Sequence, residues 1–499
     1  MKPNFVTQAF ALQTGFAGSV SSRLKTLSIM TILGLSLAGC GSLLGDDAPN
    51  TSAPLGAVVG PDRNERGLTG VGRVSEASAI EAIAGGFIVS DEPQASLAAR
   101  NVLEQGGSAA DAAVALYFTL AITQPQAAGL GGGGICLMTN PGTRITESIE
   151  FLPREATQGG GIAVPGNVRG FALLHARHGR TAWEQLLAPA ERMAATGVPI
   201  SRAMVQALEP YRNLLANQPQ LLPGYTGAPL RELGNLRQVQ LAATLGQIRS
   251  QGVNAFYVGD GANRLAKGIQ DAGGKVSADD LRNYRPIVSE TQMLSVNGAE
   301  LHLPSKATGA GAYAAALWQA LQQVPANDSQ AANRVAAEAA SKLGAAVSAP
   351  SDLGSTGFAV ASARGDAVAC AVTLNGAFGA QRSVYSRGIT LATTPVDPVK
   401  GLASAFLSPV LVTGPKSTNL AFAGAAGGNT AAAAGIQQTI RQTLGGDKTV
   451  AQALAAAARD ASVRINAIAC PKGLPYGLES CSFGVDPDGA GLGVEAIGR

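Results

Sequence analysis

The spacing of hydrophobic residues divides the chain into helical stretches and strand-rich stretches. Residues 108–123 are apolar almost all round, which predicts a buried helix that begins near Ser108. A strand-like run follows at 135–139, and from Gly357 to Asn375 two apolar runs flank a turn, which predicts a β-hairpin. Helical spacing recurs in residues 181–197, 201–216, 237–252, 262–274, 277–284 and 329–347.

The last eighty residues complete a mixed architecture. Residues 419–428 predict a strand, and residues 430–445 and 449–463 predict helices. A turn at 486–489 predicts a closing hairpin. Helices, then strands, then helices, then a hairpin indicate an α+β layered sandwich.

One glycine-rich motif does not fit a nucleotide site. Gly129, Gly131 and Gly134 have the G-x-G-x-x-G spacing of dinucleotide-binding loops. Such a loop needs a strand before it and a helix after it, whereas here a helix precedes and a strand follows. We therefore exclude a dinucleotide fold.

Composition and charge narrow the class of protein. Of the 499 residues, 46% are hydrophobic and 14% are charged, the balance of a globular chain with a sizeable core. The net charge is +3 without runs of Lys or Arg, so nothing indicates a nucleic-acid partner. His175 and His178 lie three residues apart with no Cys, Asp or Glu nearby to complete a metal site, so we expect no metal. The sequence implies no organic cofactor either.

The first forty residues predict export and a lipid anchor. The apolar run 26–40 follows basic residues and is too short to span a bilayer comfortably. Its end, Leu37 to Cys40, resembles the bacterial lipobox. This implies a signal peptide at 1–39 and acylation of Cys40, which anchors the protein facing the periplasm, at the outer membrane. An ordinary signal peptide or an anchor helix is the alternative. Residues 40–75 are typical of a flexible tether.

The cysteines fit an exported protein. Cys470 and Cys481 flank a short turn-rich loop, and a disulfide that closes this loop is expected in an oxidising compartment. Cys136 and Cys370 lie in apolar, strand-like runs, and we expect each to be a small buried hydrophobic residue.

Several segments together resemble the gamma-glutamyltransferase (gamma-glutamyltranspeptidase) family of N-terminal nucleophile hydrolases. In chain order they span roughly residues 80–499 and read EPQASLAARNVLEQGGSAADAAVA, GLGGGG, AVPGNVRGF, NAFYVGDGANRLA, AVTLNGAFG and GAAGGNT. The resemblance implies a four-layer αββα sandwich with no cofactor. It also implies self-cleavage into a large part, 76–354, and a small part, 355–499, which stay together as a heterodimer and act on gamma-glutamyl amides such as glutathione.

The family's nucleophile position falls on Ser355, with Thr356 as the second choice. Serine replaces the family's threonine, and Gly357 replaces its histidine. A hydroxyl at a new amino terminus can use its own α-amine as base. That amine titrates at roughly 7.7–8.0, so part of it is unprotonated near neutral pH. A nucleophile of this kind needs no histidine as base, which fits a chain that has only three histidines.

The resemblance assigns further roles residue by residue. Thr373 supports the nucleophile, and Asn375, two positions further along the same strand, binds the substrate. Asp397 binds the substrate ammonium, and Arg154, in a motif interrupted by two extra residues, binds the α-carboxylate through a two-pronged contact. The backbone N–H groups of the pair Gly427 and Gly428 stabilise the oxyanion.

Departures from the family pattern leave other functions open. Of the family's paired serines that bind the carboxylate, Ser404 or neither survives, and Thr393 and Thr394 replace amide or acidic side chains. The first hypothesis is a gamma-glutamyl hydrolase or transferase. The second is an acylase for a different amide, and the third is an uncleaved, inactive relative that serves as a binding lipoprotein.

Overall fold

Two antiparallel sheets form the centre of the protein. A computed structural model describes residues 84–344, 353–395, 404–457 and 463–498. The first sheet has the strand order β17-β1-β9-β10-β2-β3-β6. Its strands are β17 (Leu492–Ile497), β1 (Gly85–Ser90), β9 (Ser355–Ser362), β10 (Ala367–Thr373), β2 (Gly133–Asn140), β3 (Ile145–Glu150) and β6 (Ile287–Glu290).

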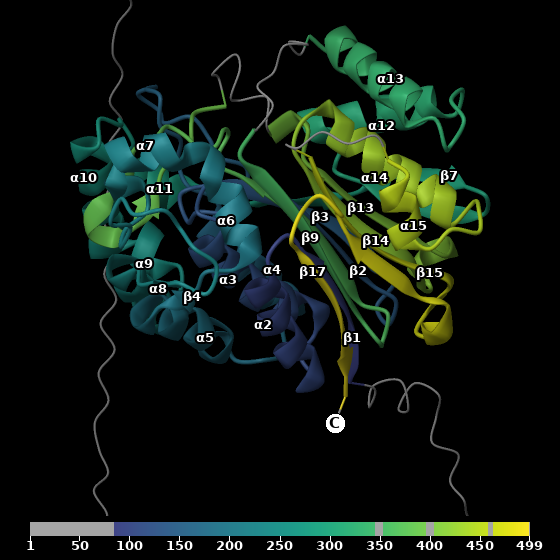
Figure 1. The fold of residues 1–499 in the computed structure, drawn as a ribbon, viewed down its shortest axis with the longest axis horizontal. Helices are drawn as coiled ribbons and strands as arrows, with labels where there is room; N and C mark the ends of the chain where they lie inside the picture. The colour runs from purple at the N-terminus through teal and green to yellow at the C-terminus, as the bar shows by residue number, and fades with distance from the viewer. Residues whose placement is uncertain (1–83, 345–352, 396–403, 458–462, 499) are drawn as a thin grey trace, which may run out of the picture. The chain divides into compact units, whose positions relative to one another are not determined.

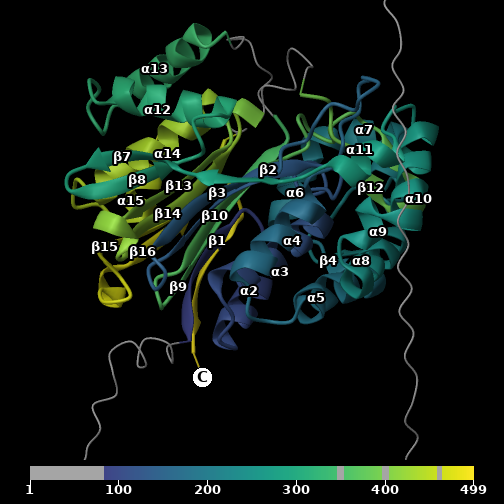
Figure 2. The same ribbon diagram turned by 180° about the vertical axis from the view of Figure 1, so that it is seen from behind.

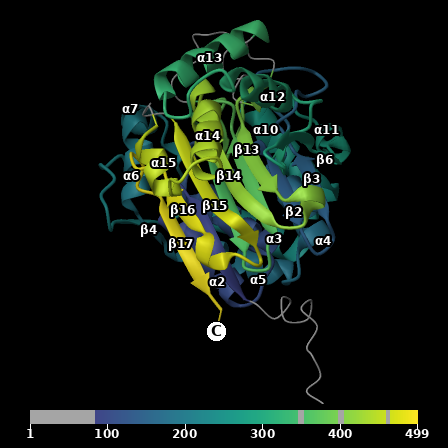
Figure 3. The ribbon, with the colours of Figure 1, turned by 90° about the vertical axis from the view of Figure 1, so that its right-hand side faces the viewer.

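The second sheet packs against the first and has the order β16-β15-β14-β13-β8-β7. Its strands are β16 (Ser482–Val485), β15 (Arg464–Leu474), β14 (Leu420–Gly427), β13 (Ser408–Thr413), β8 (Ala299–Leu303) and β7 (Gln292–Val296). Small and branched residues fill the space between the sheets, among them Val89, Ala369 and Ile468, all fully buried. Figure 3 shows the second sheet with helix α14 (Thr430–Thr443) across it.

Helices cover the outer face of each sheet, so the order of layers is αββα (Figures 1 and 2). The larger helical layer packs on the first sheet through one continuous core. It contains α2 (Pro93–Glu104), α3 (Ala109–Thr123), α4 (Asn167–His178), α5 (Trp183–Thr196), α6 (Arg202–Leu208), α7 (Arg212–Asn217), α8 (Val239–Gln251), α9 (Asn254–Tyr257), α10 (Gly259–Asp271) and α11 (Ala278–Asn283). The second sheet carries α12 (Gly309–Leu321), α13 (Ser329–Lys342), α14 and α15 (Val450–Ala455).

Local sequence signals set several of these boundaries. Ser108 caps α3 and forms a capping box with Asp111, so two N–H groups at the helix start are satisfied by side chains. Ser277 and Asp280 do the same for α11. The two-residue strand pairs β4 (Val198–Pro199) with β5 (Asn235–Leu236), and β11 (Ser383–Val384) with β12 (Ile389–Thr390), tie loops of the helical layer together.

The four-layer sandwich, the hairpin β9–β10 and the strand β14 are confirmed, but the closing hairpin is wrong. The turn at 486–489 is present, yet β16 pairs with β15 in the second sheet and β17 pairs with β1 in the first. The last turn therefore carries the chain from one sheet to the other.

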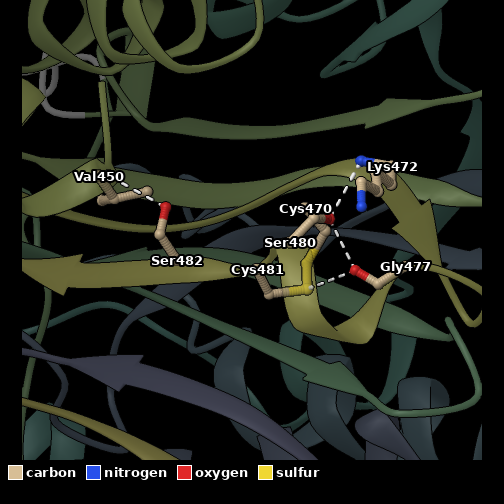
Figure 4. Close-up of a disulfide and its surroundings, with 7 residues drawn as sticks. All are labelled: Val450, Cys470, Lys472, Gly477, Ser480, Cys481 and Ser482. Atoms are coloured by element: carbon tan, nitrogen blue, oxygen red, sulfur yellow. Dashed lines mark hydrogen bonds between the residues drawn. A yellow bond between two sulfur atoms is a disulfide. The ribbon is translucent and has the colours of Figure 1, made fainter. Parts of the chain in front are cut away.

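The two cysteine predictions had opposite outcomes. The disulfide between Cys470 and Cys481 is confirmed and joins β15 to the residue directly before β16 (Figure 4). The prediction that Cys136 and Cys370 are separate hydrophobic residues is wrong, because they form a second disulfide between β2 and β10. Both cysteines are indeed fully buried, but as a cross-link between neighbouring strands.

Candidate functional site

Ser355 is the first residue of β9 and lies in the middle of the first sheet, opposite Thr373 on β10. The residue before it, Gly354, has φ +56, a conformation that favours glycine. A Cβ atom at Gly354 would lie 2.1 Å from the carbonyl carbon and oxygen of Gly376. The backbone path that leads into Ser355 therefore requires glycine at this position.

The carbonyl of Gly354, which precedes Ser355, accepts two hydrogen bonds. The hydroxyl Oγ1 of Thr373 donates to it at 2.9 Å, and the backbone N–H of Leu374 donates at 3.1 Å. The Thr373 hydroxyl is itself held by the N–H of Asn375 at 2.8 Å. Two donors draw electron density from a carbonyl carbon, which is the polarisation needed for attack by a nucleophile.

The Ser355 hydroxyl contacts the predicted oxyanion pair at the end of β14. The backbone N–H of Gly428 donates to Ser355 Oγ at 2.8 Å. A Cβ atom at Gly427 would lie 2.7 Å from the Ser355 carbonyl oxygen, so only glycine allows this close approach. Helix α14 begins two residues after Gly428, capped by the side chain of Asn429, and its N-terminus favours negative charge at this place.

The second-choice nucleophile, Thr356, has a different environment. It is buried, and its hydroxyl donates to Asp91 Oδ2 at 2.6 Å. Asn466 Nδ2 donates to Asp91 Oδ1 at 2.7 Å and also to the Gly357 carbonyl at 2.8 Å. The Thr356 hydroxyl is thus bound to a carboxyl group, whereas the Ser355 hydroxyl faces a backbone N–H group.

Asp91 is a site residue that the sequence analysis missed. Burial raises the pKa of its carboxyl group, and the hydrogen bonds from Thr356 and Asn466 oppose this rise. Its two partners lie 265 and 375 residues away in the chain. The local signal was an acidic residue directly after β1, whose sequence GGFIVS is mostly apolar.

Ser355 lines a small cavity of about 100 Å³ with both polar and apolar walls. Asp91 and Arg464 supply its charged side chains, and Arg464 lies directly across from Gly427 in the β14–β15 ladder. The other lining residues are Gln124, Gln126, Ala127, Ala203, Gln206, Ala207, Pro210, Gly489 and Ala490. A cavity with this lining suits a small, polar acyl group.

Three predicted substrate-binding residues differ in where they lie. Asn375 is buried with φ +54, donates to the Thr393 carbonyl at 3.1 Å, and accepts a hydrogen bond from Ser404 at 2.8 Å. Asp397 lies outside the described residues. The guanidinium of Arg154 lies over the ring of Tyr284, 4.8 Å from its centroid, and Arg154 is not among the residues that line the cavity.

Polar side chains without a partner, and clusters of possible metal ligands, are two further features that could indicate a bound ligand. The hydroxyls of Thr393 and Thr394 are buried and have no hydrogen-bond partner among the described residues. Within the ranges that the structure describes, no three His, Cys, Asp or Glu side chains gather closely enough to hold a metal ion. In the same ranges, no helix combines the length and apolar character needed to cross a membrane.

Comparisons with known proteins point to one family. Residues 95–342 match the family described as Gamma-glutamyltranspeptidase. Scoloptoxin SSD14 of Scolopendra dehaani is 35% identical over 231 residues, which are 42% of this chain and 40% of that protein. The glutathione hydrolase proenzyme of Bacillus subtilis (strain 168) is 33% identical over 230 residues, which are 41% of this chain and 39% of that protein. The chain thus spans about 40% of the length of these relatives.

The fold is shared over a longer stretch. The crystal structure of cephalosporin acylase from Bacillus halodurans superposes with a TM-score of 0.67 at 16% sequence identity, covering 83% of this chain and 96% of that one. This likeness supports the four-layer sandwich across both helical layers.

Proposed function

Because this chain belongs to the gamma-glutamyltranspeptidase family, we propose that it is a self-processing amidase in which Ser355 is the nucleophile. One observation carries the proposal. The Gly354 carbonyl is polarised by Thr373 and Leu374, and the adjacent Ser355 hydroxyl receives the Gly428 N–H. The first two donors prepare the Gly354 carbonyl for attack, and the Gly428 N–H holds the Ser355 hydroxyl in a fixed position next to it.

Self-cleavage follows from this arrangement. Ser355 Oγ attacks the Gly354 carbonyl carbon, and the charge that develops on the oxygen is stabilised by the Thr373 hydroxyl and the Leu374 N–H. The C–N bond breaks, the hydroxyl proton passes to the Ser355 nitrogen, and an ester remains. Water hydrolyses the ester, which releases a Gly354 carboxylate and a free Ser355 α-amine.

Turnover of a substrate repeats the chemistry on an external amide. The Ser355 α-amine accepts the proton of its own hydroxyl as Oγ attacks the donor carbonyl. The N–H of Gly428 and the N-terminus of α14 stabilise the oxyanion. The α-ammonium passes this proton to the donor's nitrogen as the C–N bond breaks and the amine leaves. Water or an acceptor amine then removes the acyl group from Ser355.

The donor in this proposal is a gamma-glutamyl amide such as glutathione. Support comes from the relative named glutathione hydrolase proenzyme and from Asn375, whose amide is held in place by Thr393 and Ser404. Arg154 and Asp397 complete the expected contacts to the donor's carboxylate and ammonium groups. The two cleavage products stay together as a heterodimer.

A specific observation favours a second candidate. Arg154 lies over Tyr284, and the cavity at Ser355 is lined instead by Arg464, Asp91 and glutamines. An acylase whose donor lacks a free amino-acid end would not need the Arg154 contact. The third reading, an uncleaved binding lipoprotein, requires that the Gly354–Ser355 bond stays intact.

The test compares two chromogenic donors. Purified protein is incubated with a gamma-glutamyl p-nitroanilide and with a glutaryl p-nitroanilide, which lacks the ammonium group. The proposal expects faster release of p-nitroaniline from the gamma-glutamyl donor, loss of activity in Ser355→Ala, and full activity in Ser341→Ala, which changes an exposed serine on α13. Faster turnover of the glutaryl donor would favour the acylase.

The lipid anchor remains part of the proposal. Residues 1–39 act as a signal peptide and Cys40 is acylated, which holds the protein at the outer membrane facing the periplasm. Residues 1–83 lie outside the described residues. Mass analysis of the mature N-terminal peptide should find a diacylglyceryl group on Cys40, and Cys40→Ala should move the protein from the membrane fraction to the soluble fraction. An unmodified peptide that begins at another residue would contradict this.

A further inference from the structure

We propose that the two products of self-cleavage are joined covalently, with the Cys136–Cys370 disulfide as the link between the chains. The proposal rests on the proposed cleavage at Gly354–Ser355. Cys136 lies before the cleaved bond and Cys370 after it, 234 residues further along the chain. A cut after Gly354 therefore converts a disulfide within one chain into a disulfide between two.

The two cysteines are brought together by the strand order. Cys136 on β2 and Cys370 on β10 are direct partners in the antiparallel ladder between these strands. Both side chains are fully buried and belong to the core between the first sheet and its helical layer. Reductants in solution therefore cannot reach the bond while the protein is folded.

The products are also interleaved strand by strand. In the first sheet, β17, β9 and β10 come from the small product, whereas β1, β2, β3 and β6 come from the large one. Each product's strands thus pair with strands of the other at β17–β1, β1–β9 and β10–β2, and in the second sheet at β13–β8. The disulfide lies within the β10–β2 junction.

The link also lies close to the reacting groups. Thr373, which polarises the Gly354 carbonyl, is three residues beyond Cys370 on β10 and pairs with Gly133 on β2. The disulfide thereby fixes the register of β2 against β10, the strand whose end lies opposite Ser355. After the cut, this register no longer depends on non-covalent pairing alone.

Formation of the Cys136–Cys370 disulfide is a two-electron oxidation. Two thiols lose two protons and two electrons, and the co-reactant is a disulfide oxidant that is reduced to two thiols. The other disulfide, Cys470–Cys481, lies wholly within 355–499 and crosses no cut (Figure 4), which makes it the matched control.

The test is electrophoresis of the denatured, self-cleaved protein with and without reductant, after free thiols are blocked with N-ethylmaleimide. The expected result is one band at the full mass without reductant and two bands with it. Cys470→Ala/Cys481→Ala should behave in the same way, whereas Cys136→Ala/Cys370→Ala should give two bands in both lanes. A non-reducing proteolytic digest of the wild type should contain one peptide pair joined through Cys136 and Cys370.

The two possible failures are distinguishable. Two wild-type bands without reductant would overturn the covalent link and leave self-cleavage intact. One band in both lanes would overturn self-cleavage and, with it, this link between chains.

A second readout is thermal unfolding at two protein concentrations. Tenfold dilution should lower the thermal midpoint of cleaved Cys136→Ala/Cys370→Ala and leave that of the wild type unchanged, since only unlinked chains separate by mass action. A wild-type midpoint that falls equally on dilution would contradict the proposal.

Discussion

Replacement of Thr356 by valine distinguishes the two candidate nucleophiles and probes the buried carboxyl group beside them. Valine keeps the shape of threonine and removes only the hydroxyl that donates to Asp91 at 2.6 Å. If Ser355 is the nucleophile, Thr356→Val still cleaves itself but is less stable. If Thr356 is the nucleophile, the variant remains a single chain.

The size of the stability loss follows from the environment of Asp91. A hydrogen bond to a charged group contributes about 1.5–3 kcal/mol, and Asp91 is buried, with Asn466 as its second side-chain donor. We therefore expect Thr356→Val to lower the free energy of unfolding by about 2 kcal/mol at neutral pH. In an Asp91→Asn background the loss should fall below about 1 kcal/mol, because no charge is left without its donor.

The pH dependence has a definite sign. Burial raises the pKa of Asp91 above its ordinary value of 3.8, and loss of the Thr356 donor raises it further. A raised carboxyl pKa means that the folded state binds the proton more tightly than the unfolded state. Because the two proteins share the same unfolded state, the deficit of Thr356→Val is full above the variant's folded-state pKa of Asp91. It shrinks as the pH falls toward the lower folded-state pKa of the parent, below which Asp91 is protonated in both.

The assay is urea unfolding of single chains followed by circular dichroism, with Ser355→Ala as the common background so that no sample is cut. The control is Thr119→Val, a buried threonine whose hydroxyl donates to the Ala115 carbonyl in its own helix at 2.9 Å. This control should lose less than about 1 kcal/mol. Equal losses for the two valine variants would refute the role given to Asp91.

Other predictions concern the oxyanion pair and an ion cluster far from the site. Gly427→Ala places a methyl group 2.7 Å from the Ser355 carbonyl oxygen, so self-cleavage followed by intact mass should slow by at least about tenfold; an unchanged rate would contradict the close approach. Arg177 and His178 bind Glu147 and hold its pKa at about 2, below the ordinary 4.5. A lowered pKa contributes stability above 4.5 that is lost as the pH falls toward about 2. Glu147→Gln should therefore lower the free energy of unfolding by on the order of 1–3 kcal/mol at neutral pH, toward the lower end of this range because Arg177 is partly exposed. Near pH 2 the difference should vanish. Urea unfolding at the two pH values measures this, and a pH-independent difference would refute it.

Much of the fold could be predicted because its signals are local. The run that becomes α3 is apolar on every side and starts at a serine cap, and the hairpin β9–β10 turns at a short polar loop. The hairpin also explains why Ser355 and Thr373 meet, since they are opposite residues at its open end. The contact between Ser355 and Gly428 came from the family resemblance, because it joins two different sheets.

The features that were missed depend on how distant strands pair. Cys136 and Cys370 each lie in an apolar strand, and nothing local shows that β2 and β10 are neighbours. The turn at 486–489 has hairpin chemistry, but chemistry alone does not say that its two strands enter different sheets. Asp91 has its partners on β9 and β15, which no pattern near residue 91 could reveal.

Self-cleavage before Ser355 is tested most directly by intact-mass analysis with N-terminal sequencing of the smaller fragment. Samples are denatured and reduced first, so that no disulfide holds the fragments together. The expected result is two chains, the smaller of which begins Ser-Thr-Gly-Phe, and a single uncut chain for Ser355→Ala. A wild-type protein that stays whole after long incubation, or a fragment that begins at Thr356, would contradict it.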